Sequence, residues 1–158
     1  MFNDNPIEGI IIKELKRFSD NRGWLCELFR EDDLDKETHP RMSYISMTLP
    51  GVARGPHAHV EQTDYFVFMG PSTFRVFLWD NRESSPTYMN RMIIDAGEDR
   101  PLAVIVPPGV VHAYKNIGDT NGIVLNFPNR LYKGQDRKDP IDEVRHEDDP
   151  NSIYRLEI

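Results

Sequence analysis

The chain lacks several features that mark whole classes of protein. It has one cysteine, Cys26, so no disulfide can form within it. No apolar run approaches the roughly 20 residues that a membrane-spanning helix needs. Its first residues carry neither the positive start nor the apolar core of a secretory signal. We therefore expect a cytoplasmic protein with no membrane partner.

Basic residues are also in deficit. The chain has 19 Lys and Arg against 26 Asp and Glu, a net charge of −7, and no basic stripe interrupts this balance. Such a surface repels a phosphate backbone, so nucleic acid is not an expected partner. With 158 residues, 39% of them apolar, the chain can bury one sizeable core. It is expected to form a single domain, residues 1–158.

Helical periodicity is scarce, and twelve prolines interrupt the chain. Only residues 31–38 and 139–147 could make short helices. Short segments rich in β-branched and aromatic residues recur between turn-forming residues. These expected strands are residues 9–15, 24–29, 44–49, 65–69, 74–79, 102–107 and 122–127. Many short strands without crossover helices predict an all-β jelly-roll barrel, with short helices near the C-terminus.

Two histidines stand one residue apart in GVARGPHAHVEQTDYFVFMG, residues 51–70. Residues i and i+2 of a strand point to the same face, so His57 and His59 are expected to enter one cavity if that face is the barrel interior. The spacing of the glycines, the two histidines and Asp64 resembles the first motif of the cupin superfamily. PPGVVHAYKN resembles the second motif and supplies His112. The pair of motifs implies the cupin double-stranded β-helix.

Three imidazoles and one carboxylate also suit a divalent transition metal. The first alternative is therefore a metal-dependent cupin, an oxygenase or an isomerase. Its ligands would be His57, His59, Asp64 and His112.

Six segments, in order along the chain and including parts of the two motifs above, resemble the dTDP-4-dehydrorhamnose 3,5-epimerase family. They are FSDNRGWLCELF (18–29), GVARGPHAH (51–59), DNRESSPTY (80–88), VPPGVVHAYKN (106–116), LYKG (131–134) and EDDPNSIY (147–154). The resemblance implies an isomerase that uses no cofactor or metal. Its substrate would be a nucleotide-linked 4-keto-6-deoxy sugar, bound to dTDP in the family.

The resemblance also implies roles for single residues. His57 would be the base, Tyr132 the acid on the opposite face of the sugar, and Asp149 the carboxylate that orients His57, with Asp148 as the alternative. The substrate-binding residues would be Asp20, Arg22, Glu27, Arg54, His59 and His112. In the family the first three often come from a neighbouring subunit, and we expect a homodimer.

The sequence also departs from the family. Met42 and Tyr44 replace an expected Gln and Asn, and the lysine expected after the histidine loop is missing. A histidine at position 59 is more similar to the related nucleotide-sugar 3,4-ketoisomerases. The reaction is therefore either epimerisation or ketoisomerisation, and a sugar-binding module without turnover is a third alternative.

The chain's other motifs carry structural expectations. Trp24, Phe66, Phe68 and Trp79 are expected in the core or the cavity wall. The polar tail, residues 133–151, is expected to fold back as a flap, because it is followed by the apolar alternation SIYRLEI.

Overall fold

The computed structural model describes residues 1–157. One sheet contains β1 (Asn3–Asp4), β6 (Ala53–Ala58), β8 (Thr73–Asp80), β9 (Asn90–Gly97), β11 (Val110–Asn116) and β13 (Val144–Arg145). The other contains β2 (Ile11–Glu14), β5 (Tyr44–Thr48), β7 (Asp64–Phe68), β10 (Leu102–Val106) and β12 (Gly122–Asn126). A hairpin consists of β3 (Arg17–Asp20) and β4 (Gly23–Cys26). Three short 3-10 turns cover Glu31–Asp33, Lys36–Thr38 and Gln135–Arg137.

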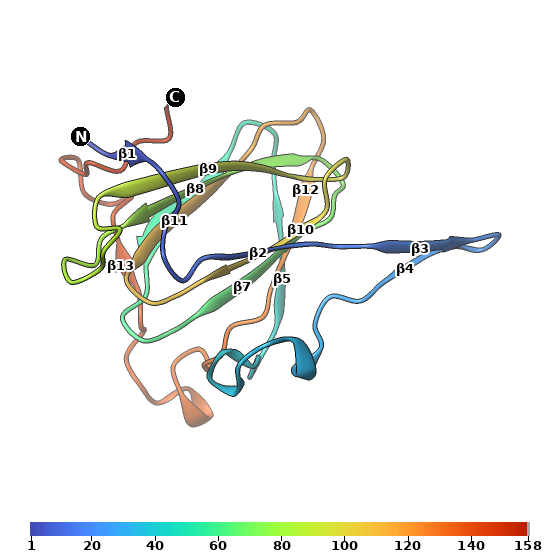
Figure 1. Ribbon diagram of the computed structural model, residues 1–158, viewed down its shortest axis with the longest axis horizontal. Coiled ribbons are helices and arrows are strands. Elements are labelled where there is room, and N and C mark those ends of the chain that lie inside the picture. The colour runs from blue at the N-terminus through green and yellow to red at the C-terminus, as the bar shows by residue number, and fades with distance from the viewer. Residues whose placement is uncertain (158) are drawn as a thin grey trace.

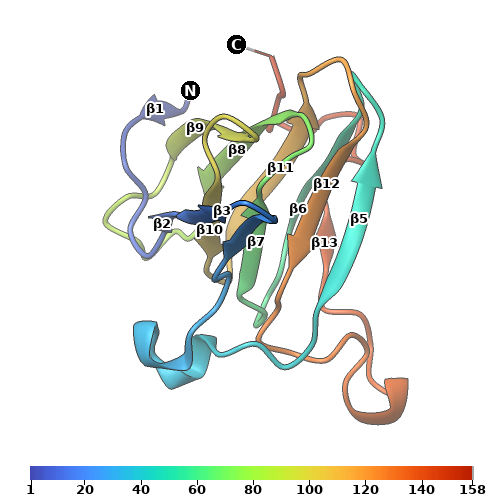
Figure 2. The ribbon, with the colours of Figure 1, turned by 90° about the vertical axis from the view of Figure 1, so that its right-hand side faces the viewer.

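The two large sheets face each other and form a jelly roll (Figures 1 and 2). The strand orders are β1-β9-β8-β11-β6-β13 and β2-β10-β7-β12-β5. Strand β1 pairs with β9 in parallel, and the other pairings within residues 1–157 are antiparallel. The predicted all-β jelly-roll fold is confirmed.

The apolar segments of the central strands β7 and β10 are continuous because both faces of these strands are covered. Phe66 and Phe68 of β7 pack between the sheets. On the outer face of the same strand, Tyr65 and Val67 pack beneath the chain that follows the hairpin. Trp79 of β8 packs against Phe2 and Tyr154 on the outer face of its own sheet. A strand covered on both faces loses the alternation of polar and apolar residues, and here all five residues of β7 are buried.

The hairpin of β3 and β4 projects away from the barrel as an arm (Figure 1). Trp24, expected in the core, lies on this arm and is 56% exposed. Phe18 and Leu25 are exposed beside it. The expectation for Trp24 is therefore wrong, because an apolar residue in a strand-like segment was taken to face a core that the arm does not reach.

The tail folds back as expected, but not as a helix. Residues 139–147 contain no helix, and their strand β13 pairs with β6, with Arg145 opposite His57. The charged composition of this segment suits a helix, and Pro140 is compatible with its first turn, but the open edge of β6 offers backbone partners instead. The short helical element near the C-terminus is the turn at Gln135–Arg137.

Strand β6 lies very close to β11 at Gly55. This glycine has a φ of 81°, and a Cβ placed on it would lie 2.6 Å from the carbonyl oxygen of His112. The register of the two strands shifts at this point. Glycine is needed here because a side chain would separate the strands and move His57 away from His112.

The DNRESSPTY segment forms a structural network around Asp80, which is fully buried. The Asp80 carboxylate accepts hydrogen bonds from the Arg82 guanidinium, the Ser85 hydroxyl and the Thr87 hydroxyl. Burial alone would raise the pKa of Asp80, but these hydrogen bonds outweigh burial and hold its pKa well below the usual range. This part of the family signature therefore stabilises a loop.

We predict that Asp80→Asn lowers the free energy of unfolding at pH 7 by about 2–4 kcal/mol, because it breaks a buried, hydrogen-bonded ion pair. The folded-state pKa of Asp80 is depressed. Its stabilisation is therefore complete above the unfolded-state pKa of about 3.9 and is lost as the pH falls below it. Urea denaturation of both proteins should show their difference in stability narrowing below about pH 4.

The matched control is Asp95→Asn, because Asp95 forms a half-exposed ion pair with Arg75. It should cost less than about 1 kcal/mol. Equal effects of the two substitutions would contradict the role given to Asp80.

Candidate active site

A cavity of about 1200 Å³ opens between the two sheets where the tail crosses the barrel. Its wall is formed by residues of β5, β6 and β11 and by residues 128–147. His57, His59, Arg54 and Tyr132 all line it. The structure therefore brings four of the candidate site residues predicted from the sequence to one cavity.

His57 lies on β6 directly opposite His112 of β11. The centroids of their rings are 4.6 Å apart. Burial, together with the neighbouring imidazoles of His112 and His59, lowers the pKa of His57 to about 3. The ring is therefore neutral at pH 7, which is the form that accepts a proton.

Two carboxylates from the tail flank His57. The Nδ1 atom of His57 is 3.9 Å from Glu143 Oε1 and 3.9 Å from Glu147 Oε1. Burial raises the pKa of Glu147. Because opposite charges favour each other, these glutamates are placed to stabilise an imidazolium formed at His57.

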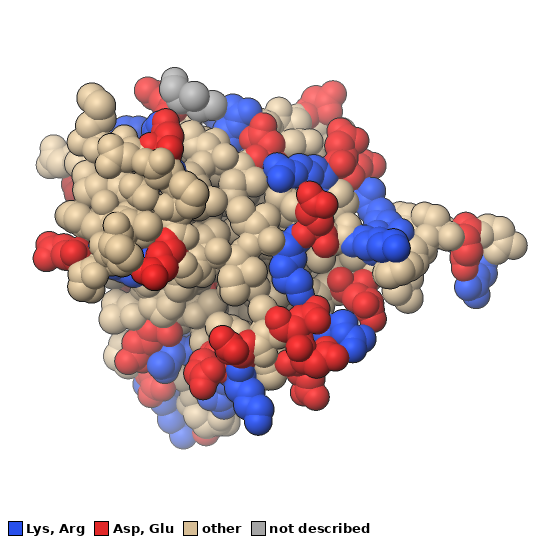
Figure 3. Space-filling model, in the orientation of Figure 1, with Lys and Arg blue, Asp and Glu red and all other residues tan. Residues whose placement is uncertain are grey.

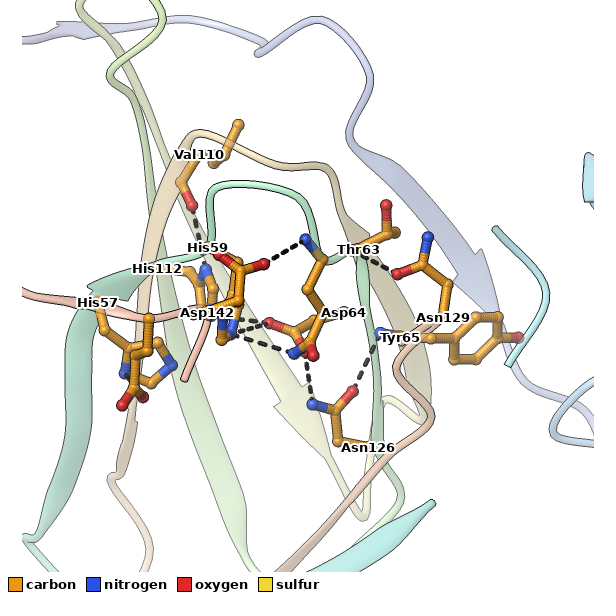
Figure 4. A network of polar contacts seen from close by, with 12 residues as sticks. His57, His59, Thr63, Asp64, Tyr65, Val110, His112, Asn126, Asn129 and Asp142 are labelled. Carbon is orange, nitrogen blue, oxygen red and sulfur yellow. Dashed lines mark hydrogen bonds and ion pairs between the residues drawn. The ribbon is translucent and has the colours of Figure 1, made fainter. Parts of the chain in front are cut away.

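His59 is held in place by two contacts (Figure 4). Its Nδ1 atom contacts the Asp142 carbonyl oxygen, and its Nε2 atom lies 3.1 Å from Asp64 Oδ2. Burial alone would lower the pKa of His59, but contact with the negative charge of Asp64 outweighs burial and raises it to about 9. His59 is a wall residue with both ring nitrogens engaged.

Asp64 is buried beneath the histidines, with 1% of its surface exposed. Its Oδ1 atom accepts hydrogen bonds from the side-chain amides of Gln62, at 2.9 Å, and Asn126, at 2.8 Å. Its Oδ2 atom lies 3.2 Å from His112 Nε2. Burial would raise the pKa of Asp64, but the contacts with the two imidazoles lower it below its usual range, so Asp64 carries a charge.

His112 is 3% exposed and is not part of the cavity wall, so it does not face a substrate as expected. Its Nδ1 atom lies 3.1 Å from the Val110 carbonyl oxygen. Each of His57, His59 and His112 has a ring nitrogen within 4.8 Å of a ring nitrogen of the other two. Such a cluster of nitrogens is a candidate metal site.

The structure does not bring Asp148 or Asp149 to His57. Both are exposed, and Asp149 Oδ1 accepts the backbone N–H of Asn151. The expected orienting role of these residues is therefore corrected, because Glu143 and Glu147 occupy that position.

Asp20, Arg22 and Glu27 also lie away from this chain's cavity. Asp20 and Arg22 pair with each other at the end of the arm, and Glu27 follows β4. None of the three lines the cavity described above. A role in binding would therefore require a second subunit.

Tyr132 and Arg54 both line the cavity. Tyr132 is 52% exposed. Arg54 Nε donates to Thr48 Oγ1 at 3.0 Å, and its Nη2 donates to the Met47 carbonyl oxygen at 2.8 Å. These bonds fix the plane of the guanidinium against β5, next to the cavity.

Sequence reasoning missed the tail residues that complete the site. Asp142 anchors the tail, because its carboxylate accepts the backbone N–H groups of Val60, Glu61 and Gln62 at 2.8, 2.9 and 2.8 Å. The one available signal was a cluster of acidic residues in a segment with a proline. That signal does not reveal which carboxylate faces inward.

The chain was compared with known families and proteins. A family model described as dTDP-4-dehydrorhamnose 3,5-epimerase matches residues 4–148. A probable low-salt glycan biosynthesis epimerase of Haloferax volcanii, Agl13, is 38% identical over 138 residues, covering 87% of this chain and 86% of that protein. The spore coat polysaccharide biosynthesis protein SpsL of Bacillus subtilis is 34% identical over 126 residues, covering 80% and 82%.

The fold agrees with these matches. A crystal structure of a dTDP sugar isomerase from Desulfovibrio desulfuricans G20 superposes with a TM-score of 0.76 at 24% identity. The match covers 88% of this chain and 84% of that one. The family model and the 38% identical relative show that a chain with this fold is an isomerase. The chain is a member of the dTDP-4-dehydrorhamnose 3,5-epimerase family.

None of the helical elements within residues 1–157 is long and apolar enough to cross a membrane.

We predict that Asp142→Ala loosens the tail, because it leaves three backbone N–H groups of the histidine loop without their acceptor. Trypsin should cleave between residues 133 and 147 about tenfold faster than in the unchanged protein, since local opening sets the rate. Mass spectrometry of timed digests measures the rate. Asp136→Ala, in an exposed ion pair with Lys138, is the control and should leave cleavage unchanged. Equal rates for the two variants would contradict the anchoring role of Asp142.

Proposed function

We propose that this protein epimerises a nucleotide-linked 4-keto-6-deoxy sugar, with dTDP as the nucleotide, by removing a proton next to the carbonyl. The observation that carries the proposal is His57, a neutral imidazole in the cavity wall with two carboxylates at 3.9 Å. The family supports the nucleotide and the sugar class. Both relatives described above act in glycan or polysaccharide biosynthesis, which supports a role in supplying a sugar for a surface polymer.

The chemistry requires a base, and His57 has the position for it. A carbonyl acidifies the hydrogens on its adjacent carbons, so an imidazole can remove one as the enolate forms. Glu143 and Glu147 would stabilise the resulting imidazolium by charge attraction. Only a proton moves, so the step consumes no redox cofactor.

Tyr132 would complete the reaction as the acid. It lines the same cavity as His57, and its side chain is half exposed. Return of a proton from the face opposite the base inverts the carbon centre. Arg54 would bind the diphosphate, because its fixed guanidinium offers a planar fork that suits phosphate oxygens.

The alternative ketoisomerase reaction would use His59 as a second proton carrier. The Nδ1 atom of His59 contacts the Asp142 carbonyl, and its Nε2 atom lies beside Asp64. Neither nitrogen is free to exchange a proton with a substrate in the cavity. This arrangement favours epimerisation by His57 over ketoisomerisation by both histidines.

We predict that His57→Asn slows deuterium uptake next to the carbonyl by about 100-fold or more, because the base is lost. The assay incubates a dTDP-4-keto-6-deoxy sugar with enzyme in deuterated water and follows exchange by NMR. Binding of dTDP should stay within about threefold, measured by calorimetry.

His39→Asn is the control, because His39 bonds the Leu34 carbonyl outside this cavity and should leave exchange unchanged. Exchange at the normal rate in His57→Asn would remove the base assignment. A wild-type protein that is stabilised by the sugar but exchanges no deuterium would be a binding module rather than an epimerase.

We further propose that the protein acts as a cytoplasmic homodimer in which the arm of one subunit meets the other. The arm projects from the body and carries an acidic and a basic side chain near its tip (Figure 3). Phe18, Trp24 and Leu25 leave apolar surface exposed on it. A partner that covers this surface would bring Asp20, Arg22 and Glu27 to a neighbouring cavity.

We predict that Trp24→Ser combined with Leu25→Glu converts a dimer into a monomer, because it removes the apolar contact and places a charge in it. Light scattering after size-exclusion chromatography should show the mass fall from twice 18.4 kDa to about 18.4 kDa. Ile153→Glu is the control, since Ile153 is an exposed apolar residue in the segment that follows the tail. A variant pair that stays dimeric would exclude the arm as the interface.

A further inference from the structure

Tyr44 brings a second tyrosine hydroxyl group to the cavity that contains His57. It is the first residue of β5 and lines the cavity from the sheet that faces β6. It is 46% exposed, so a molecule bound in the cavity can contact it. On the neighbouring strand β12, Asn126 lies directly opposite Tyr44 in the register of the two strands.

The side-chain amide of Asn126 has one orientation that satisfies its neighbours. Its Oδ1 atom accepts the backbone N–H of Tyr65 at 3.0 Å, so the other end of the amide is the nitrogen (Figure 4). This Nδ2 atom donates one hydrogen to Asp64 Oδ1 at 2.8 Å and the other to Tyr44 Oη at 2.9 Å. The Tyr44 oxygen therefore accepts a hydrogen bond from Asn126.

The hydrogen of the Tyr44 hydroxyl is left for an acceptor in the cavity. Among residues 1–157, the bond from Asn126 is the one hydrogen bond of Tyr44 Oη. Partial removal from water raises the pKa of Tyr44 to about 12, against the opposing effect of the Asn126 bond. The hydroxyl thus keeps its hydrogen at neutral pH. A hydroxyl that accepts a hydrogen bond is also a stronger donor, because linked hydrogen bonds polarise one another.

The Asn126 amide also connects this hydroxyl to the histidine cluster. Asp64 Oδ2 lies 3.2 Å from His112 Nε2, and the centroid of the His112 ring is 4.6 Å from that of His57. Tyr44 and His57 thus line one cavity from its two sheets. A sugar ring between the sheets can present an acidic carbon to His57 and the adjacent carbonyl oxygen to Tyr44.

Proton removal by His57 needs a donor at that oxygen, because negative charge develops there in the transition state. Arg54 already donates its Nε and Nη2 hydrogens to β5. The hydroxyl of Tyr114, which also lines the cavity, lies 3.3 Å from Ser46 Oγ. Ser46 Oγ itself donates to a carbonyl oxygen of β12, so it accepts the hydrogen of Tyr114. The Tyr44 hydroxyl is the better placed donor.

We propose that Tyr44 is a catalytic residue that donates a hydrogen bond to the sugar carbonyl oxygen and stabilises the enolate. The inference rests on the epimerase reaction proposed above. His57 takes the proton, the electron pair of the C–H bond forms a C=C bond, and the π pair of the carbonyl moves to its oxygen. Tyr44 keeps its own hydrogen, and return of a proton from Tyr132 to the carbon restores the carbonyl.

The first test is Tyr44→Phe, which removes the hydroxyl and keeps the ring. The rate of deuterium exchange at saturating substrate should fall by about 100-fold, the usual effect of losing one such donor. KM and the Kd of dTDP should stay within about threefold, because the bond strengthens only as charge develops. The matched control is Tyr114→Phe, which should keep the exchange rate within about threefold of the unchanged protein.

A second measurement detects the hydrogen bond without turnover. The His57→Asn variant should bind the 4-keto sugar without reacting, so infrared difference spectroscopy can record the stretching frequency of an isotope-labelled carbonyl. We expect a frequency below that of the free sugar, because a donor at the oxygen weakens the C=O bond. In His57→Asn combined with Tyr44→Phe, the frequency should return toward that of the free sugar.

Exchange at the normal rate in Tyr44→Phe, or one carbonyl frequency with and without the hydroxyl, would overturn the proposal and leave the epimerase reaction intact. A raised KM with an unchanged kcat would also overturn it, because Tyr44 would then bind the sugar equally in the ground state and the transition state. If the unchanged protein exchanges no deuterium, the proposed function itself is wrong, and Tyr44 has no enolate to stabilise.

Discussion

The buried charge of Asp64 is the constraint on which the site depends. A carboxylate between two sheets is tolerated only if it is paired and hydrogen-bonded. Here Asn126 of β12 and Gln62 bind one oxygen, while His59 and His112 of β11 approach the other. These contacts link the sheet that contains β7 and β12 to the sheet that contains β11. The same compensation that makes the buried charge possible therefore fixes two imidazoles at the base of the cavity.

The tail adds one wall of the cavity beside this fixed cluster. Strand β13 adds to β6 by backbone pairing, and Asp142 holds the histidine loop through three N–H groups. This docking places Glu143 and Glu147 beside His57. A segment held by one short strand and one carboxylate is also the part of the wall best suited to open for a substrate.

The sequence predicted the barrel because runs such as residues 65–69 and 102–107 lie in strands covered on both faces. It also placed His57 and His59 on one face, which strand geometry requires. It could not predict the partner of His57, since the register of β13 on β6 depends on backbone contacts that leave no side-chain pattern. The expectation that Trp24 lies in the core was wrong, because its exposure depends on where the hairpin projects from the barrel, and the local sequence pattern does not reveal this.

The central claim is that His57 faces the sugar of a nucleotide-linked substrate inside this cavity. A crystal structure of the protein with a bound dTDP-sugar tests it most directly. The account predicts the diphosphate at Arg54 and the sugar ring within about 3–3.5 Å of the His57 imidazole, the distance at which a proton can be transferred. A sugar bound elsewhere, or a His57 ring turned to solvent in the complex, would contradict it.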